Sequence, residues 1–265
     1  MRMASLSSGS SGNAIYVGTE ETHLLVDAGI SNRRIEKGLN EVGIPADGLN
    51  ALMVTHEHSD HVQGLSVLLK KHAVPLYATE GTLQALRRKG ILDHCPEELV
   101  HVVRAGESFL VGDVTISPFS VDHDAAEPVA YRFDSGNTAA AVATDMGHYT
   151  EETVRRLKGL DCILIESNHD IRMLEAGPYP YPLKRRILGD FGHLSNESAG
   201  RLLSEILNDN VKKIILGHLS KENNLPELAF ETVKWEISAG ACPYKGTDFR
   251  IEVAKRDAVS AVTEF

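Results

Sequence analysis

The feature that most constrains this sequence is a dense run of metal-binding side chains, His56-Glu57-His58-Ser59-Asp60-His61. The run follows the apolar residues 51–54 and precedes residues 62–71, where apolar side chains recur at helical spacing. We therefore place it where a strand turns into a helix. In the extended part, His56 and His58 project to the same side and can hold one ion. The carboxylate and the third imidazole lie around the bend, where they can face a second ion.

A lone His-x-His pair is most simply part of a solvated loop. Three imidazoles and one carboxylate within residues 56–61, directly after an apolar strand, favour a metal site instead. Neutral imidazole and ionised carboxylate are ligands that suit zinc, manganese or iron. The residues alone therefore predict a metal-binding protein.

Hydrophobic patterning predicts an α/β (α+β) protein in which helices cover two sheets. We expect strands at residues 14–17, 23–26, 51–54, 76–78, 100–103, 108–111, 114–119, 129–133, 139–144, 162–165 and 213–216. We expect helices at residues 32–42, 62–71, 82–89, 151–157, 197–207 and 226–235. Residues 5–12, rich in serine and glycine, are interpreted as a native loop flexible enough to approach a cleft.

Length and composition favour a single folded domain that spans residues 1–265. No apolar run approaches the roughly 18 residues that cross a bilayer, and no apolar leader is visible. Three widely spaced cysteines without a CxxC pair fit a reducing compartment, so we expect a cytoplasmic protein with no membrane partner. A net charge of −10 excludes a protein that coats nucleic acid non-specifically, and a polyanionic substrate must meet a local basic patch.

Residues 55–61 resemble the HxHxDH signature of the metallo-β-lactamase superfamily. The rest of that family's pattern follows in order, each residue after an apolar strand pattern, as Asp27, His123, Asp145 and His218. The resemblance implies a four-layer αββα sandwich and a hydrolase with two divalent metal ions. It assigns the first ion to His56, His58 and His123, the second ion to Asp60, His61 and His218, with Asp145 shared. Asp27 would support the metal-binding loop.

Two cations a few ångströms apart acidify a water molecule and polarise the carbonyl or phosphoryl group under attack. Asp60 is additionally placed to accept a hydrogen bond from the attacking water and to orient it. We therefore expect Asp60 to be both a ligand and a catalytic residue. The substrate does not follow from this scaffold alone.

His193 narrows the substrate class. Residues 192–196, Gly-His-Leu-Ser-Asn, resemble the Gly-His-Ser segment that precedes the last histidine in the RNase Z phosphodiesterases. There the histidine assists phosphate cleavage, by donating a hydrogen bond or a proton. The alternative for this segment is a helix start capped by Ser195 or Asn196, and both roles can hold together.

The strand-end segment 166–170 holds a further histidine, His169, beside Asn168. Strand-end loops line the cleft in this fold, so we expect Asn168, His169 and Ser195 to contact either the metal ligands or the substrate. His169 could also replace or supplement a metal ligand. An ordinary polar loop histidine is the alternative.

Residues 6–13, 166–170 and 192–196 together look like the YycJ-type (WalJ-type) branch of the superfamily, and the resemblance extends through a terminal strand at residues 248–254. Members of that branch are regarded as cytoplasmic 5′ to 3′ DNA exonucleases. The resemblance therefore implies a phosphodiesterase whose partner is DNA.

Basic and aromatic residues near residue 193 are candidates for nucleic-acid contacts. Lys184 precedes Arg185 and Arg186, whose guanidinium groups can hold a phosphate bidentately. Tyr179 and Tyr181 can stack on bases, or their proline-rich stretch can form a rigid loop over the cleft. Residues 87–89 form another basic run, which a solvated helix face explains equally well.

Other functions remain open at this point. A β-lactamase, a thioesterase of the glyoxalase II type or a lactonase would use the same metals, but His193 favours phosphoesters. A small cyclic-phosphate or phosphonate-pathway phosphodiesterase would share the whole site. A metal-binding regulatory protein without turnover is disfavoured, because the ligand set leaves room for a reactive water.

Overall fold

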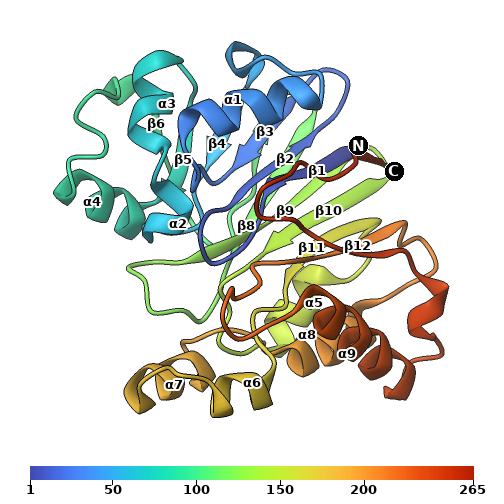
Figure 1. Ribbon diagram of the computed structural model, residues 1–265. Coiled ribbons are helices and arrows are strands. Elements are labelled where there is room, and N and C mark those ends of the chain that lie inside the picture. Colours follow the sequence, from blue (N-terminus) through green and yellow to red (C-terminus); the bar gives the residue numbers. More distant parts are fainter.

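The computed structural model describes all 265 residues, which form two seven-stranded sheets packed face to face (Figure 1). The first sheet has the strand order β14-β1-β2-β3-β4-β5-β6. Its strands are β1 (Arg2–Ser7), β2 (Ala14–Gly18), β3 (His23–Val26), β4 (Ala51–Met53), β5 (Leu76–Thr79), β6 (Val100–Val103) and β14 (Thr263–Glu264). Strands β3 to β6 run parallel, whereas β14, β1 and β2 are antiparallel to their neighbours.

The second sheet has the order β13-β12-β11-β10-β9-β8-β7 and mirrors this division. Its strands are β7 (Phe109–Val111), β8 (Val114–Ser120), β9 (Val129–Ser135), β10 (Thr138–Ala143), β11 (Cys162–Glu166), β12 (Lys213–Gly217) and β13 (Ile251–Val253). Strands β10 to β13 are parallel, and β7 to β9 form an antiparallel meander.

Helices cover the outer face of each sheet, which completes a four-layer αββα sandwich (Figure 1). The first sheet carries α1 (Asn32–Glu41), α2 (Ser59–Val62), α3 (Leu65–Lys71) and α4 (Glu80–Arg88). The second carries α5 (Glu151–Leu157), α6 (Ile171–Ala176), α7 (Tyr181–Leu188), α8 (Asn196–Ile206) and α9 (Pro226–Ala239). The predicted fold is therefore confirmed. No helix is long and apolar enough to span a bilayer.

Three apolar cores correspond to the three interfaces between the layers. Alternate residues of β2 show how one strand serves two cores: Ile15 and Val17 face the second sheet, while Tyr16 lies under the helices of the first. Because both faces are buried, the strand is apolar throughout, as two-sided burial requires. The third core lies between the second sheet and its own helices.

The structure differs from the sequence expectations at three segments whose residues are small or rich in proline. Residues 5–7 belong to strand β1, and only residues 8–13 form the loop. Hydrogen bonds with the backbone of β2 hold residues 5–7 in the sheet, although the serine side chains there give no apolar pattern. The expected helix at 62–71 begins only at Leu65, as α3, because the short helix α2 ends at Val62 and Gly64 packs against the Ile30 carbonyl, where a Cβ would clash. The proline-rich stretch starts helix α7, with Pro182 in its first turn.

The terminal strand is also shorter than expected. A single 3-10 turn (Gly246–Asp248) precedes β13, which covers only Ile251–Val253. The chain then returns across the molecule, and β14 pairs with β1 so that the two termini lie side by side (Figure 1).

Candidate metal centre

The candidate ligands gather because their strands end at one edge of the sandwich. Parallel strands present their carboxyl ends on the same side, and β3, β4, β10, β11 and β12 therefore release their following residues together. Strand β8 has the same direction as β10, since both are antiparallel to β9. The structure accordingly brings together all seven side chains that the sequence singled out as ligands, His56, His58, Asp60, His61, His123, Asp145 and His218.

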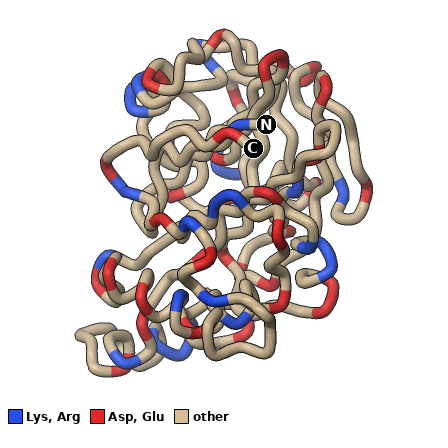
Figure 2. The backbone as a smooth tube through the Cα atoms, turned by 90° about the vertical axis from the view of Figure 1, so that its right-hand side faces the viewer, with Lys and Arg blue, Asp and Glu red and all other residues tan.

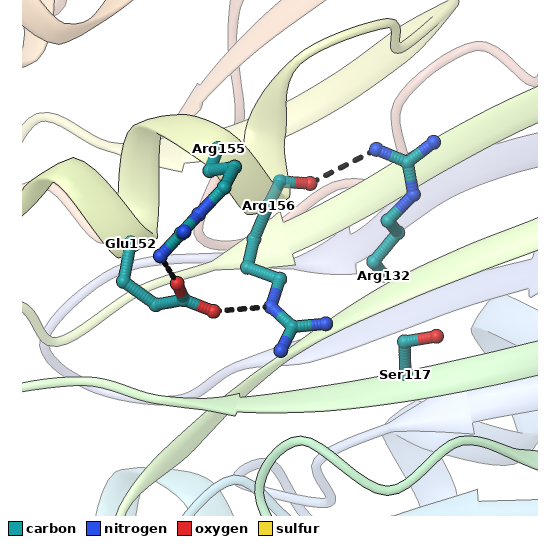
Figure 3. A pocket seen from close by; sticks show the side chains of 5 residues that line it. All are labelled: Ser117, Arg132, Glu152, Arg155 and Arg156. Atoms are coloured by element: carbon teal, nitrogen blue, oxygen red, sulfur yellow. Dashed lines mark hydrogen bonds and ion pairs between the residues drawn. The ribbon is translucent and has the colours of Figure 1, made fainter.

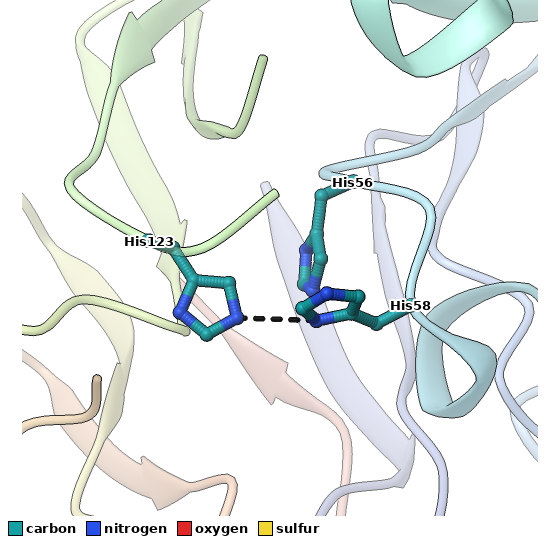
Figure 4. Close-up of side chains that lie close together, drawn as sticks. All are labelled: His56, His58 and His123. Carbon is teal, nitrogen blue, oxygen red and sulfur yellow. Dashed lines mark hydrogen bonds between the residues drawn. The ribbon is translucent and has the colours of Figure 1, made fainter. Parts of the chain in front are cut away.

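Six of these side chains form two groups of three, each suited to one cation, and the seventh, Asp145, lies close to both. His56, His58 and His123 offer ligand atoms within 4.8 Å of one another, and their rings converge from two loops (Figure 4). The Nε2 atom of His123 lies 3.2 Å from Nδ1 of His58. Asp60, His61 and His218 form the second group.

Asp145 lies between the two groups. Its Oδ2 atom is 3.0 Å from Nε2 of His61, and its Oδ1 atom is 3.7 Å from Nε2 of His123. In the second group, Nε2 of His218 is 3.1 Å from Oδ2 of Asp60. One carboxylate thus faces both groups, which is the position of a bridging ligand.

Two buried atoms test whether a cation fits. Nε2 of His56 is enclosed and has no hydrogen-bond partner, and the enclosed Oδ2 of Asp145 has only the His61 ring nitrogen beside it, at 3.0 Å. A buried polar atom without a partner costs about 1–3 kcal/mol, so such atoms in a folded protein call for a further ligand. An imidazole nitrogen and a carboxylate oxygen in one group are the donors that zinc, manganese or iron takes. The residues therefore fit a metal ion.

Backbone strain marks the same edge of the sandwich. Asp27, Asp145 and His218 are the non-glycine residues with positive φ, at 62°, 58° and 54°. Each follows an apolar strand closely, and the left-handed conformation turns its side chain into the site. Such conformations cost of order 1 kcal/mol or more and persist where the surrounding structure enforces them, often at functional sites.

In His56, His61 and His123, a neighbouring group contacts Nδ1, so Nε2 is the nitrogen that would face a cation. Nδ1 of His61 lies 2.7 Å from Oδ2 of Asp27, a direct contact that fits the expected supporting role of Asp27. Nδ1 of His123 donates to the Gly192 carbonyl at 3.0 Å. Nδ1 of His56 lies 3.0 Å from the Thr55 hydroxyl.

Glu166 is a functional residue to which the sequence assigned no role. It ends strand β11, is fully buried, and accepts from Nδ1 of His193 at 2.8 Å and Nδ1 of His218 at 2.9 Å. Its other oxygen accepts from the backbone N–H groups of Met146 and Leu194. An acidic residue that ends an apolar strand, as Asp27 follows β3, was the signal that could have identified it.

Charge in the site is strongly coupled. Burial raises the pKa of the Glu166 carboxyl, but His193 and His218 outweigh it and bring the pKa down to about 2. Burial lowers the pKa of His218, but Asp145, Asp60 and Glu166 outweigh it and raise the pKa to about 10. Several carboxylates share one buried space, so positive charge is required there, and bound cations can supply it.

His193 lies beside both groups and completes the edge of the site. Its ring centroid is 5.1 Å from that of His123 and 5.3 Å from that of His218, and its side chain is 19% exposed. Burial lowers the pKa of His193, but the Glu166 carboxylate outweighs that effect and the pKa is raised. The arrangement leaves an oriented, partly accessible imidazole next to the candidate ligands.

The remaining strand-end residues have structural contacts. Ser195 is the N-cap of α8 and accepts from the Ser198 N–H, as the capping alternative predicted. Asn168 donates to the His218 carbonyl at 2.9 Å and so supports that residue's backbone. His169 is buried next to Asn168 and lies outside all the ligand groups, and burial lowers its pKa to about 4.

The loop at residues 8–13 also reaches the site, as the sequence predicted. The Ser8 hydroxyl accepts from the His218 N–H at 2.9 Å and donates to the Asn13 side chain at 3.0 Å. Nδ2 of Asn13 lies 3.2 Å from Nε2 of His61. Gly12 lets the loop pack closely, because an added Cβ would lie 2.6 Å from the Gly29 carbonyl oxygen.

Basic residues reach the rim of the site from two sides. Arg186 forms an ion pair with Asp124, the residue after His123, while the Lys184 ammonium turns back to the Glu175 carbonyl. Arg185 is exposed in the last turn of the same helix. On the other side, a cavity of about 320 Å³ opens beside Asp60 and is lined by Ser10, Ser11, Ser59 and Lys89 among others.

Elsewhere, basic and acidic residues are interspersed along the chain (Figure 2). A hollow on the second sheet gathers Arg132, Arg155 and Arg156, and Glu152 pairs with the last two (Figure 3). Arg132 contacts Asp134 and the Arg156 carbonyl. These three arginines therefore have partners of their own, away from the histidines of the site.

Comparison with known proteins agrees with this geometry. Residues 22–218 match the Beta-lactamase superfamily domain. The chain is 40% identical over 259 residues to the Exodeoxyribonuclease WalJ of Streptococcus pneumoniae, covering 98% of this chain and 96% of that protein. It is 41% identical over 224 residues to the Exodeoxyribonuclease YycJ of Bacillus anthracis, covering 84% of each.

Two solved structures share the fold over nearly the whole chain. The metallo-β-lactamase fold protein YhfI from Bacillus subtilis has a TM-score of 0.72 at 17% identity, covering 98% of each chain. Zn(2+)-bound PqqB from Methylobacterium extorquens has a TM-score of 0.74 at 18% identity, covering 100% of each. At these identities the two structures show the fold alone, which is that of the metallo-β-lactamases. Together with the curated relatives, this establishes that the chain belongs to the β-lactamase superfamily and, within it, to the family of WalJ and YycJ.

Proposed function

We propose that this protein is a metal-dependent phosphodiesterase that removes nucleotides from the 5′ end of DNA. The observation that carries the proposal is the placement of His193. It is not one of the seven ligands that the sequence predicts, its ring lies within 4.8 Å of the ligand atoms of Asp145, Glu166 and His218, and Glu166 orients it. Support also comes from relatives that match nearly the whole chain and are named exodeoxyribonucleases.

The seven candidate ligands would hold two divalent ions of zinc, manganese or iron. His56, His58 and His123 would bind the first ion, and Asp60, His61 and His218 the second, with Asp145 shared. When bound, such ions supply Lewis-acid activation of water and of the phosphoryl group under attack.

The chain's own side chains would perform the remaining tasks. Asp60, 22% exposed at the mouth of the second group, can accept a hydrogen bond from the attacking water and fix its direction. When its ring is doubly protonated, His193 can donate from Nε2 to the phosphate or to the leaving oxygen. The Glu166 carboxylate favours that state, because it accepts from Nδ1 and raises the pKa of His193. A thioester would need this donor less, since a thiolate can leave without a proton.

Substrate contacts would come from the two basic rims. Arg185 and Arg186 can hold phosphates on the side of His123, and Lys89 lines the cavity beside Asp60. Tyr181 begins helix α7 and is 72% exposed, so it can receive a base.

A substrate panel tests this proposal. The metal-reconstituted protein is incubated with end-labelled single- and double-stranded DNA and RNA, bis(p-nitrophenyl) phosphate, a β-lactam, a thioester and a lactone. We expect mononucleotides to be released from the 5′ end of DNA, with Arg186→Ala slower than the control Arg155→Ala. Hydrolysis of the lactam, thioester or lactone, while the DNA stays uncleaved, would overturn the proposal. A protein that binds metal but hydrolyses none of these substrates would be a regulatory protein instead.

A further inference from the structure

Phe191 is an exposed aromatic residue at the mouth of the site, and the mechanism above does not use it. It lies two residues before His193 and is 60% exposed. A phenylalanine left in water forgoes much of the about 1.5–3 kcal/mol that burial would provide. Its exposure beside a candidate active site makes the ring available to a ligand.

The backbone around Phe191 is held firmly on several sides. The Phe191 carbonyl accepts from the Asp124 N–H at 3.2 Å, and the next carbonyl, that of Gly192, accepts from Nδ1 of His123. The Asp190 carbonyl accepts from Nδ1 of His148 at 3.1 Å. The ring is thus presented by a pinned loop, which reduces the entropy lost when a ligand stacks on it.

Distance along the chain places the Phe191 backbone within about one nucleotide of His193. Two extended residues span at most about 7 Å, so the Phe191 Cα lies within that distance of the His193 Cα. Through the Asp124 N–H, Phe191 is equally close to the segment that carries His123. A base attached to a phosphate at the metal groups can therefore reach the ring.

The surroundings favour a nucleobase over a protein surface. Leu188 is the exposed apolar neighbour in the segment, and charged Arg185, Arg186 and Asp190 are exposed around it. A specific protein interface buries about 800 Å² per partner, which two side chains among charges do not provide. Aromatic rings beside basic groups are instead the combination by which single-stranded nucleic acid is held.

We propose that Phe191 is a base-stacking residue that receives the nucleobase next to the scissile phosphate. This inference rests on the proposed function, because it names how the same site grips its DNA. It predicts that recognition depends on the presence of a base at that position and only weakly on its identity, since every base has a π-face.

The test compares Phe191→Ala, Phe191→Leu and Phe191→Tyr with the wild type on two sets of oligonucleotides. One set is intact, and the other carries an abasic residue at the first or at the second position from the 5′ end. Trp235→Ala is the control, because Trp235 is 65% exposed on helix α9. Metal content and melting temperature show that each variant is folded and loaded.

We expect kcat/KM on intact DNA to fall about 5- to 150-fold for the alanine and leucine variants, as 1–3 kcal/mol of stacking implies. Phe191→Tyr and Trp235→Ala should match the wild type, and all variants should coincide on one of the abasic substrates. Equal losses on intact and abasic DNA, or no loss, would overturn the inference. A Phe191 variant with a changed oligomeric state and unchanged cleavage would also overturn the inference and would indicate a protein contact instead. A wild-type protein that cleaves no DNA would overturn the proposed function itself.

Discussion

Replacing Glu166 by glutamine should damage both the metal centre and the orientation of His193. The carboxylate uses one oxygen to accept from the Nδ1 atoms of His193 and His218 and the other to accept from two backbone N–H groups. Glutamine offers one oxygen and one NH₂ group, so it can accept hydrogen bonds from only one of these two pairs of donors.

Two orientations of the new amide are available, and their costs can be compared. If its NH₂ group faces the backbone, two buried N–H donors lose their acceptor, at about 1–3 kcal/mol each. If it faces the imidazoles, each Nδ1 must become an acceptor and the proton moves to Nε2, the atom with which His218 would bind metal. The second orientation avoids buried unpaired donors, so we expect it to dominate.

The Glu166→Gln variant should therefore lose about 10- to 100-fold in metal affinity, as is usual when a group that orients a ligand is removed. Its unfolding free energy should fall by about 1–4 kcal/mol, because two charge-assisted hydrogen bonds become neutral ones. Metal titration by calorimetry, denaturant unfolding of the metal-free protein and bis(p-nitrophenyl) phosphate cleavage measure the three effects. Glu152→Gln, which alters a surface ion pair, is the matched control (Figure 3). A Glu166→Gln variant with wild-type metal affinity and turnover would refute this reasoning.

Three further predictions concern single residues. Asp60→Ala should lose most hydrolysis on every substrate while stability falls less, and near-wild-type turnover at saturating metal would show that another group orients the water. His193→Ala should keep its metal but lower DNA cleavage by about 10²- to 10⁴-fold, with a smaller loss on bis(p-nitrophenyl) phosphate, and unchanged rates on both would make it purely structural. Away from the site, hydrogen bonds from Lys71 and His72 lower the pKa of Glu36 from 4.5 to about 2. Because the folded pKa lies below the unfolded one, this stabilisation is present above pH 4.5 and is lost as the pH falls towards 2. At pH 6 the unfolding free energy of Glu36→Gln should thus be roughly 1 kcal/mol lower than that of the wild type, which a lower melting temperature would show. In acid the two melting temperatures should converge.

Sequence patterns predicted the sandwich well because its parallel strands are buried on both faces and read as apolar runs. Residues such as Asp145 and His218 could be found because each follows such a run directly. Strand β1 was missed because Ser5 and Ser7 carry no apolar signal, and their place in the sheet depends on distant partners. That residues 1–265 act as a single domain stays a prediction.

The site residues that the sequence could not identify are those whose roles depend on three-dimensional contacts. Glu166 orients histidines that are 27 and 52 residues away in the chain, and no local pattern encodes that distance. Conversely, Ser195 has a local role as a helix cap, and local reasoning anticipated it as an alternative. His169 is buried next to Asn168 and lies outside the ligand groups, so a contact of His169 with the substrate stays a prediction.

Anomalous diffraction from crystals grown with manganese or zinc, recorded at the absorption edge of the metal, tests the two-metal centre most directly. We expect two peaks per chain roughly 4 Å apart, one against His56, His58 and His123 and the other against Asp60, His61 and His218, with Asp145 between them. A single peak, or two peaks away from these side chains at saturating metal, would contradict the account.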